Sequence, residues 1–413
     1  MKVNSERLWN SLMDMAKVGA TGNGGNTRLA LTDQDVLGRN LLIRWAKDLD
    51  LDVKYDAIGN MFLKKTGLDQ SLNPIVIGSH LDTQPKGGRF DGIYGVLAGF
   101  EVIQCLYERN IQTEHPLELA IWMNEEGARF TPAMMGSAVF TGKFQLKDTL
   151  TAQDKQGISV ADELYRTGQQ GELDLQRAFA AYYELHIEQG PILENNQKEI
   201  GIVTGGQAII WLDIQTTGKA AHAGTTPMSM RHDAMIGTAQ MIVDLEKMVL
   251  QKFPDGLITF GEISVENSSR NTIPANIHWT IDLRHPDDTE MESMRKIVLQ
   301  TLDQLAHKRD LDINVRLHWH SPATPFDKKC IQTVLESTQA LGYSYQKIVS
   351  GAGHDAINLA KHCPTTMIFI PCENGLSHNE AENITDLQAK QGADVLLSSI
   401  LKFDQQVTLA QVS

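Results

Sequence analysis

The chain has 413 residues, of which 42% are hydrophobic and 21% charged, and its formal net charge is −14. This length suffices for two domains with a sizeable core, and the composition is that of an ordinary globular protein. The negative charge argues against nucleic acid and anionic membrane surfaces as partners. No apolar stretch is long enough for a transmembrane helix, and residues 1–9 contain no apolar signal core. The scattered cysteines fit free thiols in a reducing cytoplasm: Cys105, Cys330, Cys363 and Cys372.

The first informative element in chain order is an apolar run at 74–77, which predicts a buried strand. His80 and Asp82 follow it two residues apart, so their side chains project the same way. Asp91 comes next, in a turn flanked by glycines. The carboxyl end of a strand is where open α/β sheets place their sites. An imidazole and carboxylates there suit a divalent metal, although a polar loop without a metal would contain the same residue types.

A helix is predicted directly after this turn, because apolar residues recur at helical spacing from 93 to 107. It would pack behind the site, and its Gly95 and Gly99 would permit close approach.

Three further apolar runs end in similar residues. The run at 117–121 leads to Glu125 and Glu126, neighbouring carboxylates that repel each other unless a cation lies between them. His186 lies in a third strand-like segment, and His378 follows a fourth at 366–371. A solvated acidic turn or a core histidine would explain any one of these alone. Four such strand ends in one chain favour a metal centre.

The character of the chain changes near residue 205. Strands are predicted at 209–216, 257–263, 277–284 and 311–319, and helices at about 231–252 and 287–308. This is a self-contained α+β unit of domain size. Since the metal-type residues lie on both sides of it, we expect a catalytic domain made of residues 1–204 and 319–413, interrupted by an inserted domain at 205–318.

A two-metal centre needs a bridging carboxylate with imidazoles and carboxylates on either side, and the pair of ions activates a shared water. The chain offers five ligands for such a centre: His80, Asp91, Glu126, His186 and His378. Asp91 suits the bridge because it is a short carboxylate on a glycine-flanked turn. Asp82 would orient His80 by accepting its other ring proton. Glu125 would be free to accept a proton from the water.

The whole chain resembles the aminoacylase/carboxypeptidase class of di-metal hydrolases. Within that class it is most similar to the N-carbamoyl-amino-acid amidohydrolases, including yeast-type β-ureidopropionase, with allantoate amidohydrolase as a close relative. His186 is the most telling position, because the peptidases of the class usually have an acidic ligand there. The motifs that carry the resemblance span nearly all of the chain: GSHLDTQP at 78–85, NEEGARF at 124–130, ELHIEQGP at 184–191, AHAGTTPM at 221–228, DLRHP at 282–286, GAGHD at 351–355 and LSHNE at 376–380.

The resemblance implies an α/β fold, with a di-metal aminopeptidase-like catalytic domain and an inserted α+β domain that closes over the substrate and forms a dimer interface. It implies one metal held by His80, Asp91 and His186, and another by Asp91, Glu126 and His378, with Glu125 as the general base. The cofactors would be two divalent ions per subunit, zinc first, with manganese, cobalt or nickel as alternatives.

The resemblance also implies residues that contact the substrate: His222, Asn271, Arg284, His354 and Gln189. His222 would polarise the scissile carbonyl, and Arg284 would hold the substrate carboxylate through its bidentate fork. From the residues alone, Arg284 would equally form a salt bridge to Asp282 or Asp287. His222 would equally be incidental in a loop, Asn271 a turn residue and His354 a helix cap, so these assignments rest mainly on the resemblance.

We therefore expect an enzyme that hydrolyses the ureido C–N bond of a small molecule, an N-carbamoyl α- or β-amino acid, giving the amino acid, carbon dioxide and ammonia. The stretch at 83–88 resembles that of carbamoyl-amino-acid and ureidopropionate enzymes and differs from that of the allantoate-degrading branch, which favours this substrate class. Two alternatives stay open. One is a hydrolase of allantoate, an N-acyl amino acid or a dipeptide. The other is a catalytically dead binding protein, which the intact Glu125 disfavours. A cytoplasmic homodimer formed through the inserted domain is expected.

Overall fold

The computed structural model describes residues 1–412, with side chains as far as residue 407. The chain forms two compact units. The main unit comprises Met1–Gly205 and the chain from Pro325 onward, and the insert comprises Gly206–Thr324. The boundary predicted after residue 318 is wrong, because it falls inside β13 (Asp312–Ser321), which continues to pair with β7 (Ala208–Thr217) as far as Ser321.

A nine-stranded sheet forms the centre of the main unit, in the order β1-β2-β4-β3-β5-β16-β6-β14, with β15 paired to β6. Its strands are β1 (Asp52–Tyr55), β2 (Met61–Lys65), β3 (Ile75–His80), β4 (Leu117–Trp122), β5 (Ala181–Ile187), β6 (Ile200–Gly206), β14 (Thr324–Pro325), β15 (Tyr345–Ser350) and β16 (Thr365–Ile370). The strands predicted from apolar runs are β3, β4, β5 and β16. They are neighbours and run parallel, so their carboxyl ends meet at one edge.

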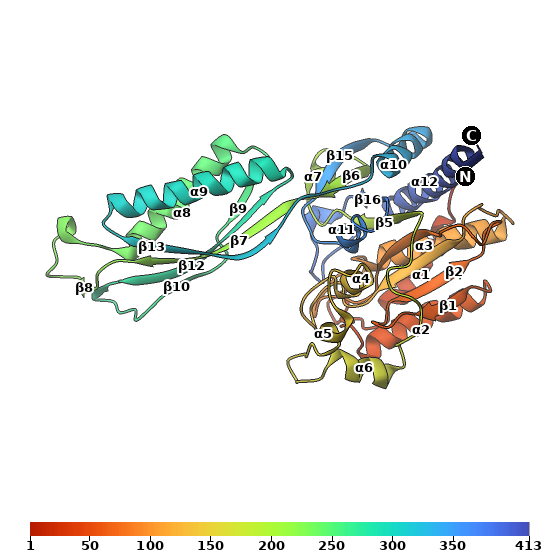
Figure 1. Ribbon diagram of the computed structural model, residues 1–413, viewed down its shortest axis with the longest axis horizontal. Coiled ribbons are helices and arrows are strands. Elements are labelled where there is room, and N and C mark those ends of the chain that lie inside the picture. Colours follow the sequence, from red (N-terminus) through yellow and green to blue (C-terminus); the bar gives the residue numbers. More distant parts are fainter. Residues whose placement is uncertain (413) are drawn as a thin grey trace. The chain divides into compact units, whose positions relative to one another are not determined.

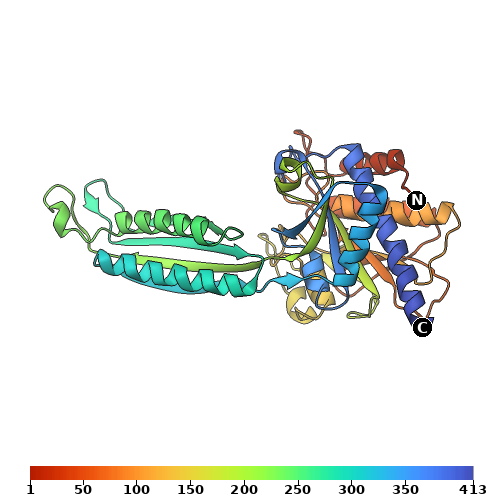
Figure 2. The same cartoon turned by 90° about the horizontal axis from the view of Figure 1, so that it is seen from above.

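Helices pack against both faces of this sheet (Figures 1 and 2). The helices of the main unit are α1 (Ser5–Ala16), α2 (Asp33–Lys47), α3 (Ile93–Glu108), α4 (Met135–Phe140), α5 (Leu146–Leu150), α6 (Val160–Thr167), α7 (Ile192–Asn195), α10 (Lys328–Leu341), α11 (Asp355–Leu359) and α12 (Asp386–Val412), with a 3₁₀ turn η2 (Glu373–Gly375). The predicted helix behind the site is α3, which contacts β3, β4 and β5. A Cβ on Gly95 would lie 2.2 Å from the carbonyl oxygen of Leu185, so the close approach predicted for this glycine is confirmed.

Alternation along the central strands divides their side chains between two cores. Ile75 and Ile77 join the core beneath α3, whereas Val76 packs on the opposite face. His80 lies four residues after Val76 on its strand, so the two side chains point to the same face. His186 lies four residues after Tyr182, which also packs on that opposite face. Both histidines therefore project from the same side of the sheet.

The insert consists of a five-stranded sheet in the order β10-β12-β7-β13, with β9 paired to β12, and a separate two-stranded ribbon. Its further elements are β8 (Ala221–His222), β9 (Leu257–Thr259), β10 (Ile263–Val265), β11 (Thr272–Ile273), β12 (Asn276–His285), η1 (Met228–Met230), α8 (Ala234–Lys252) and α9 (Asp288–Lys308). Both predicted helices are present, and they pack on one face of the sheet (Figure 1).

The strand predicted at 257–263 is interrupted, because β9 and β10 are separate segments. Opposite the interruption, the side-chain oxygen of Thr280 accepts the backbone N–H of Glu262, 3.1 Å away, in place of a regular ladder bond.

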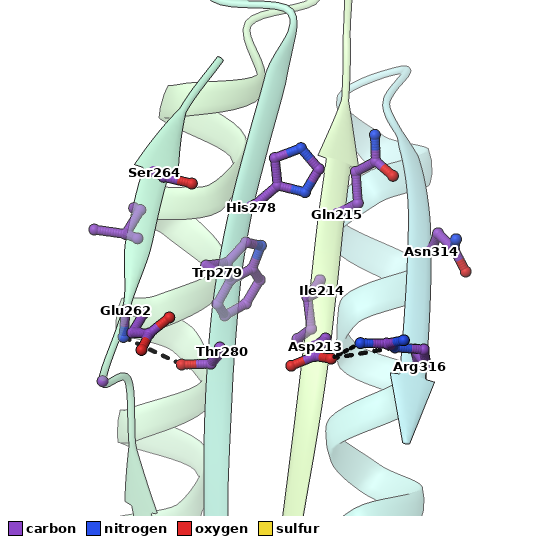
Figure 3. A pocket seen from close by; sticks show the side chains of 12 residues that line it. Asp213, Ile214, Gln215, Glu262, Ser264, His278, Trp279, Thr280, Asn314 and Arg316 are labelled. Carbon is purple, nitrogen blue, oxygen red and sulfur yellow. Dashed lines mark hydrogen bonds and ion pairs between the residues drawn. The ribbon is translucent and has the colours of Figure 1, made fainter. Parts of the chain in front are cut away.

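The other face of the insert's sheet carries polar side chains around a shallow hollow. Figure 3 shows this hollow, where Arg316 of β13 and Asp213 of β7 form an ion pair at 2.6 Å. Within residues 1–412, the helices are too short or too polar to span a membrane.

Candidate metal centre

The five side chains predicted to converge lie together at the carboxyl edge of the main sheet. They form two groups of three that share Asp91, and the possible ligand atoms of each group lie within 4.8 Å of one another. One group is His80, Asp91 and His186, and the other is Asp91, Glu126 and His378.

Asp91 lies between the two groups, with one carboxylate oxygen facing each. Its Oδ1 is 3.7 Å from His80 Nε2 and 3.2 Å from His186 Nε2. Its Oδ2 is 3.4 Å from His378 Nε2. In the second group, Glu126 Oε2 lies 3.2 Å from the same His378 nitrogen. This division of the two oxygens is what a bridging carboxylate requires.

Backbone carbonyls fix the orientation of the two buried histidines. His80 Nδ1 lies 2.9 Å from the carbonyl oxygen of Asp82, and His186 Nδ1 lies 2.9 Å from that of Ile187. A carbonyl only accepts, so each Nδ1 carries a proton, and once Nε2 is deprotonated its lone pair faces Asp91. Lone pairs facing a carboxylate oxygen require a cation between them, so these residues fit a metal ion.

The charges at the centre favour positive charge in both groups. Burial opposes a charge on His186, but the hydrogen bond and charge of Asp91 raise its pKa to about 9. The hydrogen bond to Glu126 raises the pKa of His378 to about 9 as well. Protons and divalent cations would therefore compete for the same positions.

Asp82 meets the His80 ring through its backbone carbonyl and not through its carboxylate. The backbone carbonyl of Asp82 holds the His80 ring, while the carboxylate Oδ1 is 3.9 Å from His80 Nδ1. The two carboxylate oxygens instead accept the backbone N–H groups of Glu125 and Glu126, each at 3.2 Å. Asp82 thus ties the end of β3 to the loop that follows β4.

Glu125 projects toward the first group from this loop. Its Oε2 is 3.4 Å from His80 Nε2, and the residue is 7% exposed. The preceding Asn124 has a left-handed φ of 52° and donates from Nδ2 to the carbonyl oxygen of Phe130 at 2.7 Å. Burial, and then the negative charge of Asp355, raise the pKa of Glu125 well above its usual value. A carboxyl with raised proton affinity is suited to general base catalysis.

Two residues that support the ligands were not identified from the sequence. Glu382 Oε1 accepts the backbone N–H groups of Phe90 and Asp91 at 2.9 and 3.0 Å. Gln84 donates to both carboxylate oxygens of Glu126, from its backbone N at 3.0 Å and its Nε2 at 2.8 Å. Two features of the sequence could have pointed to them: Glu382 is one of the acidic residues after His378, and Gln84 belongs to the GSHLDTQP motif.

Gln189 and His354, both expected to contact substrate, lie against ligands. Gln189 Nε2 donates to Asp91 Oδ2 at 2.9 Å and to Ser377 Oγ at 2.9 Å. The His354 ring is 2% exposed, and its centroid lies 4.6 Å from that of His186. Burial, and then the charge of His186, lower the pKa of His354 well below its usual value, so its ring is neutral.

The other three residues expected to contact substrate belong to the insert. His222 on β8 pairs with Thr272 on β11, directly after Asn271. Arg284 lies on β12 and forms the ion pair with Asp282 that the residues alone suggested, at 2.9 Å. The structure therefore brings His222 and Asn271 together on the ribbon and places Arg284 on the sheet.

The fold and the two ligand groups define a class of protein. The chain belongs to peptidase family M20/M25/M40, whose pattern matches residues 76–402, a range that includes all five candidate ligands. The predicted resemblance to this class of hydrolases is confirmed, and the chain is a hydrolase of this family.

Individual relatives of the chain have narrower descriptions than the family as a whole. The chain is 42% identical over 402 residues to an N-carbamoyl-L-amino-acid amidohydrolase of Rhizobium meliloti, covering 97% of each chain. It is 30% identical over 404 residues to the allantoate amidohydrolase of Bacillus subtilis (strain 168), covering 95% of this chain and 97% of that one. The crystal structure of a hydantoinase/carbamoylase family amidase from Burkholderia ambifaria matches with a TM-score of 0.94 and 49% identity, covering 97% of this chain and 98% of that one.

Proposed function

We propose that this protein hydrolyses the ureido group of N-carbamoyl amino acids. The observation that carries the proposal is the pair of ligand groups sharing Asp91, with the Glu125 carboxylate 3.4 Å from His80. The naming of the Rhizobium meliloti relative supports an N-carbamoyl-L-α-amino acid as the substrate, with N-carbamoyl-β-alanine as the nearest alternative.

Each residue has a defined part in this reaction. Divalent ions in the two groups, zinc first and manganese, cobalt or nickel otherwise, would acidify a water and polarise the ureido carbonyl. Glu125 takes a proton from the attacking water as the new C–O bond forms, and then delivers it to the nitrogen that leaves when the C–N bond breaks. Carbamic acid or its equivalent decomposes to carbon dioxide and ammonia.

The insert supplies the contacts to the substrate in this proposal. Arg284 and Asn271 hold the substrate carboxylate, so that the carbonyl is fixed against the water. His222 donates a hydrogen bond to the carbonyl oxygen as it becomes negative, an interaction whose removal typically costs about 2.7–4 kcal/mol of activation free energy. His354 and Gln189 contact the bound substrate beside the ligands.

A second candidate is allantoate hydrolysis, which the 30% identity to the Bacillus subtilis enzyme favours. Allantoate carries two ureido groups and one carboxylate, so the same residues would serve it.

A substrate panel separates these possibilities. Metal-stripped protein, and protein reloaded with zinc or manganese, would be assayed with N-carbamoyl-L-methionine, N-carbamoyl-β-alanine, allantoate and N-acetyl-L-methionine. We expect turnover only after reloading, and fastest for a carbamoyl amino acid. Fastest turnover of allantoate would replace the first proposal with the second, and inactivity of the loaded protein on all four would contradict both.

We also propose the cytoplasm as the compartment of the enzyme. Support comes from the four cysteines, all buried free thiols, as proteins in a reducing compartment have them.

A further inference from the structure

The loop that carries His222 is held by contacts of its own. It runs from 222 to 231 and is called here the histidine loop. We propose that Arg231 and the backbone N–H of Gly224 are positioning groups that hold His222 with its Nε2–H group directed outward as a hydrogen-bond donor. This inference rests on the proposed function, in which His222 acts on the substrate carbonyl.

The backbone N–H of Gly224 donates to His222 Nδ1 at 3.0 Å. A ring nitrogen that accepts a hydrogen bond carries no proton, so neutral His222 has its proton on Nε2. The Nε2–H group is then available to an oxygen that gains negative charge during the reaction. The loop therefore sets the tautomer that the proposed role requires.

Arg231 ties the two sides of the turn together. Its NH2 group donates to the carbonyl oxygen of Ala223 at 2.7 Å, and its Nε donates to that of Thr226 at 3.1 Å. The planar guanidinium makes both bonds in a single orientation, which a lysine ammonium on a flexible stem does not reproduce. One side chain thus fixes the backbone on both sides of Gly224, the residue that holds the ring.

The loop has few other constraints. The ribbon beneath it pairs only His222 with Thr272 and Ala221 with Ile273, and the His222 side chain is exposed. Backbone bonds run from Thr226 N to His222 O at 3.2 Å and from Ala223 N to Asn271 O at 2.9 Å, and further along the loop from Met230 N to Pro227 O at 3.0 Å and from Arg231 N to Met228 O at 3.5 Å. The ring is exposed, so packing in a core does not hold it. We therefore infer that the two hydrogen bonds of the Arg231 guanidinium do much to keep the loop in one conformation.

A double-mutant cycle tests whether Arg231 acts through His222. Arg231→Ala would be measured alone and together with His222→Asn, using the fastest substrate of the panel. Alone, it is expected to lower kcat by about tenfold to a hundredfold, with KM changed less, because a misplaced group loses its advantage of orientation. In the His222→Asn background it should have almost no further effect. Arg231→Lys should resemble Arg231→Ala.

Arg295→Ala is the matched control. Arg295 is also an arginine of the insert, but it pairs with Glu292 on the exposed surface of α9, and its loss should leave kcat unchanged. An unchanged kcat in Arg231→Ala would overturn the proposal. An equal loss with and without His222 would also overturn it, because Arg231 would then act through the fold.

The tautomer is tested without any assay of activity. Nitrogen NMR of protein labelled with ¹⁵N-histidine reports which ring nitrogen carries the proton, and the His222 signal is assigned by its absence from His222→Asn. We expect protonated Nε2 at a pH where the ring is neutral, and loss of this preference in Gly224→Pro, which lacks the N–H. Protonated Nδ1 in the unmodified protein would overturn the inference, while turnover unaffected by His222→Asn would instead contradict the proposed function of that residue.

Discussion

Glu125 and Glu126 are neighbours, but their carboxylates have different surroundings. Both oxygens of Glu126 accept hydrogen bonds from Gln84, and one also faces His378. The nearest ionic partner of Glu125 is His80, at 3.4 Å. The Glu126 carboxylate is therefore fixed in place as a ligand. The Glu125 carboxylate could reach a water held between the ligands.

We expect Glu125→Gln to lower kcat by several orders of magnitude, because the amide is nearly isosteric but cannot accept the proton. Metal content, measured by elemental analysis, should not change, since the ligand groups do not include Glu125. Glu126→Gln is the informative comparison and should lose metal from the second group. Near-normal turnover of Glu125→Gln would mean that another group is the base.

Metal affinity should depend on pH. The pKa values of His186 and His378 are raised to about 9, so below that pH both rings bind protons that a cation must displace. Zinc affinity is therefore expected to rise with pH by up to about tenfold per unit for each proton released, and to level off above about pH 9. Titration of the stripped protein against a zinc buffer measures this slope. A flat profile between about pH 6 and 9 would show that neither ring releases a proton on binding.

The ligands were predictable from the sequence because each lies at the end of a strongly apolar strand or in the segment after it, whereas the residues that hold them were not. Glu382 supports Asp91 across 291 positions of sequence, a contact that local patterns do not encode. The part played by each oxygen of Asp82 was not predictable either. The spacing of His80 and Asp82 indicates that they are close, but it does not say which oxygen of Asp82 faces the ring.

Among the elements, the turn between β3 and α3 depends on Gly92. This residue has a φ of 69°, and a Cβ placed on it would lie 2.3 Å from His80 Nε2. The turn that carries Asp91 can therefore pass this close to the histidine only if residue 92 has no side chain.

Gly92→Ala should lower both the free energy of unfolding and the affinity for zinc. Gly157→Ala is the matched control, because Gly157 has a φ of 81° but a Cβ added to it would meet no atom within 4 Å. Both changes place an alanine where φ is positive, but only the first also puts a Cβ against the His80 ring. Thermal unfolding and zinc titration of the two variants separate these effects. Equal zinc affinity in both would show that the His80 ring shifts without loss of binding.

The central strands and the helices α3, α8 and α9 were predicted well because their apolar patterns are extended and continuous. The strand predicted at 257–263 runs across the gap between β9 and β10. Beside this gap, the Thr280 hydroxyl accepts the backbone N–H of Glu262, a contact that the sequence of the segment does not reveal.

For the whole molecule, the resemblance implies a homodimer formed through the insert. β13 is the last strand of the insert's sheet, and its Leu317 and Trp319 are 54% and 40% exposed. Apolar side chains exposed along an edge strand favour a partner there.

We expect sedimentation velocity at micromolar concentration to show a dimer, and Leu317→Glu to weaken it more than Tyr165→Glu, since Tyr165 is an exposed aromatic residue of the main unit, at 89% exposure. A monomer at every concentration would rule out any contribution of the insert to a partner's site.

The chain leaves the main unit and returns to it along neighbouring strands. Ser321 of β13 lies opposite Ile209 of β7, and on the main-unit side Phe326 donates its N–H to the carbonyl oxygen of Thr204 at 2.9 Å. Because these ends are adjacent and all five candidate ligands lie outside the intervening segment, the whole segment can be exchanged as a cassette. Recognition of the substrate and the chemistry of the cations would then diverge separately in evolution, and a protein engineer could graft a new specificity here without redesigning the metal centre.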